Sequence, residues 1–347
     1  MKLKNISRLL LMASVILFLA PSCVKEGPMG PAGADGVDGK DGANGADGQV
    51  TCLVCHSGTN MAEKKAQFAM SEHSVGAIAV DYAGGRASCA QCHSHEGFIQ
   101  WAEFGKVAGD ITDPSAWKCS TCHGLHQTFE AKDYAFRVSG PAKLYPDNTK
   151  TKTLDVKGNS NLCATCHQAR VYEPNIATPG ETFKITSTHY GPHHGPQGNI
   201  VAGIGFAEIP GSVAYPVAGS SKHLEQASCT GCHMATFTAK QGGHSFIPSV
   251  DACNKCHGAT LTDYNYGGVQ SDVKAKLDQL RDKLVELGVV EYIEADAAYE
   301  PKVGTYPMIQ AQAYFNWIGI TEDRSEGVHN PKYVKALLTN TLEALNK

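Results

Sequence analysis

Six copies of the pattern Cys-x-x-Cys-His constrain this chain more than any other feature of its sequence. They occupy residues 52–56, 89–93, 119–123, 163–167, 229–233 and 253–257, and together they use twelve of the 13 cysteines. Cysteines three positions apart face the same side of one helical turn. Two such thiols can bond the vinyl groups on one edge of a haem, and the adjacent histidine can bind its iron. The pattern therefore predicts six covalently bound c-type haems.

Other uses of a Cys-x-x-Cys pair fit these repeats less well. A redox dithiol or half of a zinc site does not require histidine at the next position. The chain has 15 histidines among 347 residues, so six such coincidences do not arise by chance. The expected attachment residues are Cys52, Cys55, Cys89, Cys92, Cys119, Cys122, Cys163, Cys166, Cys229, Cys232, Cys253 and Cys256. The expected proximal iron ligands are His56, His93, His123, His167, His233 and His257.

Nine histidines remain outside the motifs, and six irons with a second axial histidine would need six of them. An iron with two histidine ligands has no open position, which suits electron transfer. The expected distal ligands lie among His73, His95, His126, His193, His223, His244 and His329. Which of them serves which motif is not given by their spacing, and His189 has the weakest context.

The N-terminus predicts export. Lys2, Lys4 and Arg8 precede an apolar run over residues 9–20, which is shorter than the roughly 20 residues that span a membrane. Small residues then precede Cys23, in an arrangement that resembles the lipobox of bacterial lipoproteins. We expect a signal peptide over 1–22 and a lipid on Cys23, which would place the mature protein at the outer membrane, on its periplasmic or cell-surface face.

Three further segments follow the predicted signal peptide. Residues 23–49 carry glycine at every third position from 27 to 48, which is a collagen-like run that could act as a spacer or as a trimerising stalk. Residues 50–270 show little periodicity, so haem groups rather than side chains are expected to fill this hexahaem domain. Residues 271–347 predict long helices packed on it: an apolar stripe from Val273 to Leu287, a second helix over about 306–318, and a third from Asn330. The expected fold is mainly α with much irregular loop.

Three segments resemble the multihaem cytochromes related to ammonia-forming nitrite reductase and hydroxylamine oxidoreductase. They are residues 189–197, residues 229–234 followed by His244, and residues 327–331. The resemblance covers most of the chain from residue 52 onward. It implies closely packed haems with mostly paired histidine ligands, long C-terminal helices, and distal roles for His244 and His329. The Cys-x-x-Cys-Lys motif that commonly holds the catalytic haem of those reductases does not occur here.

These features favour electron transfer over catalysis. The expected partners are other redox proteins or extracellular electron acceptors, and the net charge of −4 gives no reason to expect nucleic acid. One alternative is a reductase of a small nitrogen or sulfur oxyanion, with one open iron near Tyr190, His189 or His194. Another is a trimer or filament in which haems stack between chains.

Overall fold

The computed structural model describes residues 56–124, 136–144, 153–170, 181–258 and 260–347, which belong to one compact unit, Val50–Lys347. A second unit, Met1–Gln49, contains the predicted signal peptide, Cys23 and the collagen-like run, and it lies outside the described residues. Three predicted haem-binding residues also lie outside them: Cys52, Cys55 and His126.

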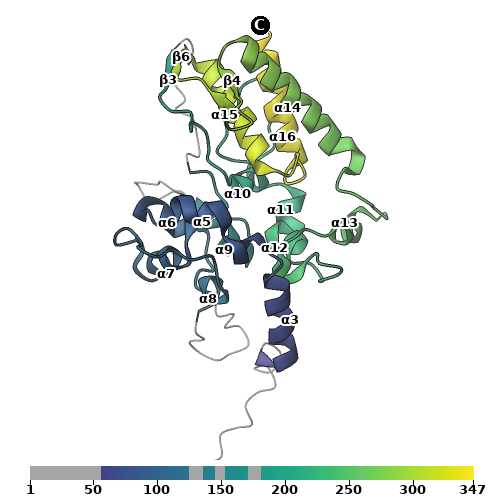
Figure 1. Cartoon of the computed structure of the whole chain (residues 1–347). Helices are drawn as coiled ribbons and strands as arrows, with labels where there is room; N and C mark the ends of the chain where they lie inside the picture. Colours follow the sequence, from purple (N-terminus) through teal and green to yellow (C-terminus); the bar gives the residue numbers. More distant parts are fainter. Residues whose placement is uncertain (1–55, 125–135, 145–152, 171–180, 259) are drawn as a thin grey trace, which may run out of the picture. The chain divides into compact units, whose positions relative to one another are not determined.

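Short helices joined by irregular segments make up the part of the unit that carries the motifs (Figure 1). They are α3 Gly58–Phe68, α4 Glu72–Val75, α5 Ala77–Ala83, α6 Ala87–His93, α7 His95–Phe104, α8 Cys119–Cys122, α9 Ser160–Ala164, α10 Gln197–Ala202, α11 Lys222–Gln226, α12 Ser228–His233, η1 Gly243–Ser245, α13 Val250–His257 and η2 Tyr266–Gly268. Serine side chains cap several of them, as Ser94 does by accepting a hydrogen bond from the Gly97 amide at the start of α7.

Three pairs of short antiparallel strands accompany these helices. They are β1 Ala142–Lys143 with β2 Thr153–Leu154, β3 Thr182–Ile185 with β6 Gly304–Pro307, and β4 Val290–Ile293 with β5 Ala298–Pro301. Thr182 pairs with Pro307 and Ile185 with Gly304, so β3 joins the middle of the chain to the segment before the penultimate helix. None of these strands is evident in the sequence, because four residues or fewer are too short to establish an alternating pattern.

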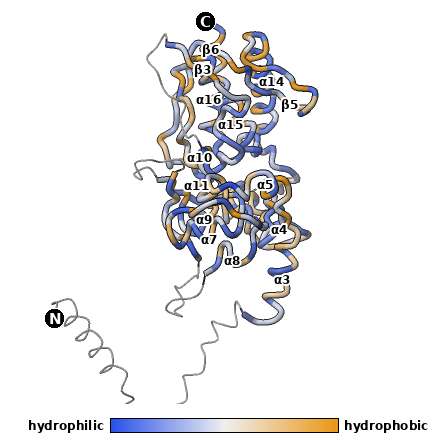
Figure 2. Tube along the Cα trace, turned by 60° about the vertical axis from the view of Figure 1, so that its left-hand side comes forward, coloured by the Kyte–Doolittle hydropathy of each residue, from blue (hydrophilic) through white to orange (hydrophobic). Residues whose placement is uncertain are grey.

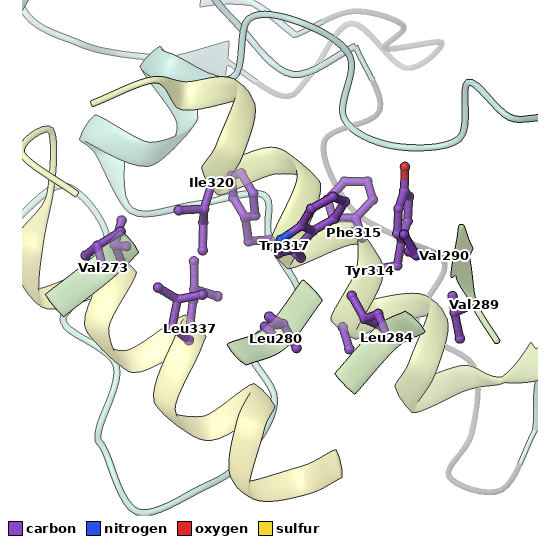
Figure 3. Close-up of a cluster of buried hydrophobic side chains, with 14 of the residues drawn as sticks. Val273, Leu280, Leu284, Val289, Val290, Tyr314, Phe315, Trp317, Ile320 and Leu337 are labelled. Atoms are coloured by element: carbon purple, nitrogen blue, oxygen red, sulfur yellow. The ribbon is translucent and has the colours of Figure 1, made fainter. Parts of the chain in front are cut away.

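Three longer helices form the C-terminal part: α14 Val269–Glu286, α15 Met308–Asp323 and α16 Pro331–Leu345. They pack against one another (Figures 1 and 3). The apolar stripe of α14 buries Val273, Leu280 and Leu284. Helix α15 is apolar around most of its circumference, and it is correspondingly buried on most sides. Helix α16 begins where Asn330 accepts a hydrogen bond from the Tyr333 amide, with proline at its first position.

Most of the large buried side chains lie among these three helices. Figure 3 shows Tyr314, Phe315, Trp317 and Ile320 of α15 beside Leu337 of α16 and the apolar residues of α14. A second, smaller cluster lies around β1, β2, α9, α10 and α11, and it consists of alanine, valine and leucine. The apolar side-chain core is therefore concentrated in the helices that follow the last motif.

Buried asparagines attach irregular segments to this core. The Asn316 amide accepts from Ala207 N at 3.0 Å and donates to Ala207 O at 2.8 Å. Asn340 bonds the backbone of Val213 in the same two ways. Figure 2 shows hydrophobic and hydrophilic residues interspersed along the described chain, and none of the described helices is both long and apolar enough to cross a membrane.

Candidate haem-binding sites

Each of the five described motifs lies on a short helical turn. The second motif ends α6 at His93, the third forms α8, and the fifth and sixth end α12 and α13. The fourth begins in α9 and continues its last turn, since His167 N donates to Cys163 O at 2.9 Å. The turn gives the two thiols and the histidine a common side, which is the arrangement that covalent haem attachment requires.

In all five of these motifs the histidine ring lies opposite a second histidine ring from elsewhere in the chain. The ring centroids are 5.8 Å apart for His93 and His193, 5.9 Å for His167 and His73, 6.1 Å for His257 and His223, 6.2 Å for His233 and His329, and 6.3 Å for His123 and His244. An iron bound on both sides at about 2 Å per metal–nitrogen bond separates two imidazole centroids by roughly 6 Å. The spacing therefore fits one haem iron between the two rings of each pair.

Hydrogen bonds at Nδ1 orient several of these rings. His93 Nδ1 lies 3.1 Å from Ala79 O, His233 Nδ1 2.8 Å from Phe246 O, and His223 Nδ1 2.6 Å from Val328 O. A backbone carbonyl can only accept, so Nδ1 carries the proton in these three rings. The lone pair is then on Nε2, which is the nitrogen left to bind iron.

Burial keeps two of the opposing histidines neutral. It lowers the pKa of His73 to about 4, with a further contribution from His167. It also lowers the pKa of His193 to about 4, with help from His194 and His93. A neutral imidazole is the form that binds a metal, so both rings are ready to act as ligands near pH 7.

The loop between α15 and α16 serves two of the pairs. It carries His329, whose Nδ1 lies 2.7 Å from Asp323 Oδ1 at the end of α15. It also supplies the Val328 carbonyl that orients His223. Gly327 in this loop has a φ of 91°, which is accessible to glycine without strain. One turn of backbone thus positions the opposing histidines of the fifth and sixth motifs.

The fourth motif contacts two others. Its Cys166 thiol is a neighbour of Cys92 in the second motif, whose Sγ lies 3.8 Å from Thr165 O, and its Cys163 thiol is a neighbour of Cys229 in the fifth. Ser160 Oγ, at the start of α9, lies 3.2 Å from Thr230 Oγ1 between the two cysteines of the fifth motif. The attachment edges of these three sites are therefore adjacent.

Other residues singled out in the sequence lie elsewhere. His95, predicted as a distal ligand, has its Nδ1 2.7 Å from Thr121 Oγ1, and it is not a member of any of the five ring pairs above. His194 forms an ion pair with Glu322 at 3.1 Å, while its neighbour His193 faces His93. Tyr190 packs against Tyr314 and Phe315 of α15, and His189 has no opposing ring among the described residues.

The residues that orient these histidine rings are not evident from the sequence. Gln197 Oε1 lies 3.2 Å from His167 Nδ1, and Asp323 contacts His329. The proximity of Asp323 to His329, six positions apart, is a weak signal for the second contact. No sequence signal marks the backbone carbonyls, because any residue supplies one. Groups of three or more histidine, cysteine or acidic side chains that could hold a separate metal ion do not occur among the described residues.

Paired histidines over Cys-x-x-Cys-His turns define a multihaem c-type cytochrome, and two comparisons with known proteins support this class. The chain is 25% identical to "C-type polyheme cytochrome OmcC" of Geobacter sulfurreducens, in a match that covers 69% of this chain and 38% of that protein. Its fold is similar to the crystal structure of outer cell wall cytochrome OcwA, with a TM-score of 0.52, 19% identity, and coverage of 81% of this chain and 50% of that one. The chain thus spans half or less of each relative's length. No family model matches it.

Proposed function

We propose that this protein is a hexahaem electron carrier of the cell envelope. The observation that carries the proposal is the set of five opposed histidine pairs at 5.8–6.3 Å. When bound, each haem would supply one-electron chemistry between ferric and ferrous iron. Histidines on both sides leave no position for a substrate, so these five sites favour electron transfer over catalysis.

The chain's own residues would hold the groups close together. Cys166 is a neighbour of Cys92, and Cys163 of Cys229, so the attachment edges of three bound haems would lie side by side. Helices α12 and α13 also pack together, which brings the sixth motif beside the fifth. The motifs therefore follow one another in space in the order second, fourth, fifth, sixth, and this continuity is what a protein that passes electrons along its length requires.

Two adjacent histidines allow a sharp test of ligation. His193 faces His93, whereas His194 pairs with Glu322. In the holoprotein, H193A should convert one haem from low spin to high spin and create one site for carbon monoxide, while H194A should leave the spectrum unchanged. Equal spectra for wild type and H193A would refute the assigned pair.

The first motif completes the proposed count of six. Cys52, Cys55 and the candidate distal ligand His126 lie outside the described residues, so this site rests on the sequence. Intact-mass analysis should find six haems per chain, and five after C52A/C55A. Carbon monoxide binding by the unaltered, reduced protein would instead indicate an open iron and favour the reductase alternative.

We also propose that the protein is an outer-membrane lipoprotein held through Cys23, with residues 27–48 as a spacer. The predicted signal peptide and lipobox-like segment support this proposal, and the structural relative is described as an outer cell wall cytochrome. Its partners would be other redox proteins or extracellular acceptors. A C23A variant should lose incorporated fatty acid and leave the membrane fraction. If deletion of residues 27–49 changes a trimer into a monomer, the run is a stalk and not a spacer.

A further inference from the structure

Asp323 is a buried carboxylate in contact with an opposing histidine. Its Oδ1 lies 2.7 Å from His329 Nδ1, and its side chain is fully enclosed at the end of α15. Ser325 Oγ donates to the other carboxylate oxygen, and the same hydroxyl accepts from His329 N at 3.2 Å. Hydrogen bonds to both carboxylate oxygens therefore fix the position of Asp323.

No lysine or arginine of the described residues forms an ion pair with this carboxylate. Neighbouring Arg324 lies 3.9 Å from Glu322, and Glu322 also pairs with His194. Among the described residues, the ion-pair partner of Asp323 is His329. A buried anion is costly unless an opposite charge compensates it. That charge must come from the imidazole and from the iron behind it.

The other oriented histidines have neutral partners. Backbone carbonyls accept hydrogen bonds from Nδ1 of His93, His233 and His223. The partner of His167 Nδ1 is the side-chain amide oxygen of Gln197. His329 is the member of this oriented set whose partner is a carboxylate. The sixth motif offers the closest comparison, because the same α15–α16 loop orients His223 through the uncharged Val328 carbonyl.

We infer that Asp323 is a positioning residue that lowers the reduction potential of the haem held by His233 and His329, below the value that an uncharged hydrogen-bond partner at His329 would give. This inference rests on the proposed function. The carboxylate draws the Nδ1 proton of His329 toward itself, so the imidazole becomes a stronger electron donor to the iron. The iron–porphyrin core would carry one net positive charge when ferric and none when ferrous. Reduction by one electron would therefore leave Asp323 without its compensating charge, and the oxidised state is favoured.

The direct test is D323N in the full holoprotein. Asparagine keeps the size and the acceptor oxygen but removes the charge. In a potentiometric titration with dithionite as reductant, followed by visible spectra, the haem held by His233 and His329 should shift to higher potential. The electron paramagnetic resonance signal of one low-spin ferric haem should change as well. E343Q is the matched control, since it makes the same carboxyl-to-amide change on α16 at a residue that bonds Ser212.

A second variant tests the same idea in the opposite direction. S325A removes the hydroxyl that donates to the carboxylate, so more of the negative charge of Asp323 is left to face His329, and the potential of the haem held by His233 and His329 should move lower. This variant keeps the inference testable if D323N loses a haem. Unchanged potentials and resonance signals in both variants would overturn the inference.

One further variant separates this inference from the proposed function. H329A should remove one haem from the low-spin population and thereby identify the component that D323N shifts. If H329A leaves the low-spin count unchanged, His329 is not a ligand and the proposed pairing fails. If H329A acts as expected and neither D323N nor S325A moves that component, only the role of Asp323 fails.

Discussion

Gly327 should be a point at which a single methyl group disturbs two of the proposed axial ligands, His223 and His329. Its φ of 91° is strained for alanine by about 1–2 kcal/mol. An added Cβ would also lie 2.7 Å from Val273 Cγ2 on α14, and overpacking of this kind costs about 1–3 kcal/mol. G327A should therefore destabilise the fold by roughly 2–5 kcal/mol. Because Val328 and His329 follow directly, relief of the contact would displace the groups that orient His223 and oppose His233.

The measurements are the far-UV unfolding midpoint and the low-spin fraction of the holoprotein. With about 2–4 °C lost per kcal/mol in a domain of this size, G327A should lower the midpoint by roughly 4–20 °C and convert part of the proposed fifth and sixth haems to high spin. G105A is the control, since Gly105 has a φ of 70° but no atom within 4 Å of an added Cβ. G105A should lower the stability only by the cost of placing alanine at a positive φ, and every haem should stay low spin.

A double-mutant cycle isolates the contact itself. V273A removes the methyl groups that a Cβ at Gly327 would meet, so G327A should cost less in the V273A background than in the wild type. The difference should be about 1–3 kcal/mol, which is the overpacking contribution alone. If G327A and G105A have equal effects, or if the two substitutions at Gly327 and Val273 are additive, the contact carries no strain and the reasoning is wrong.

Further predictions concern the elements that support the sites. N316A should leave the buried Ala207 amide and carbonyl without partners, at about 1–3 kcal/mol each, and hydrogen exchange should accelerate over residues 205–215. L337A should cost about 2–5 kcal/mol in the core while the haem spectrum stays unchanged, as thermal unfolding and visible spectra would show. The Glu322–His194 pair raises the pKa of His194, so its stabilisation is present below the usual pKa of histidine and lost as pH rises through the raised value. The midpoint difference between wild type and E322Q should therefore be larger at pH 5.5 than at pH 8.

The helices after the last motif could be anticipated because their signal is local. The stripe from Val273 onward predicts a helix near Ser271, and α14 runs over Val269–Glu286. The second and third expectations, over 306–318 and from Asn330, correspond in position to α15 at Met308–Asp323 and α16 at Pro331–Leu345. The pairing of β3 with β6 could not be anticipated, because it joins segments more than 100 residues apart through four backbone positions.

Among the histidines, sequence and structure contribute differently. Histidine count and sequence context predicted seven candidate distal ligands. Five of them lie opposite the histidine ring of a Cys-x-x-Cys-His motif in the structure. The choice between His193 and His194 depends on backbone direction, since His193 has a φ of 70° and its ring turns toward His93. His95 was an equally good candidate by spacing, yet its ring contacts Thr121.

The sequence by itself predicted the covalent chemistry of this protein. Two cysteines and a histidine within five residues suffice to name the expected attachment and proximal residues without a fold, and the five described motifs each lie on one helical turn. Only the tertiary structure decided which histidine opposes which, that the fourth motif contacts the second and fifth, and that a carboxylate rather than a carbonyl lies behind His329. These contacts join residues that are often far apart in the chain, and their formation depends on how the loops between the short helices fold back on one another.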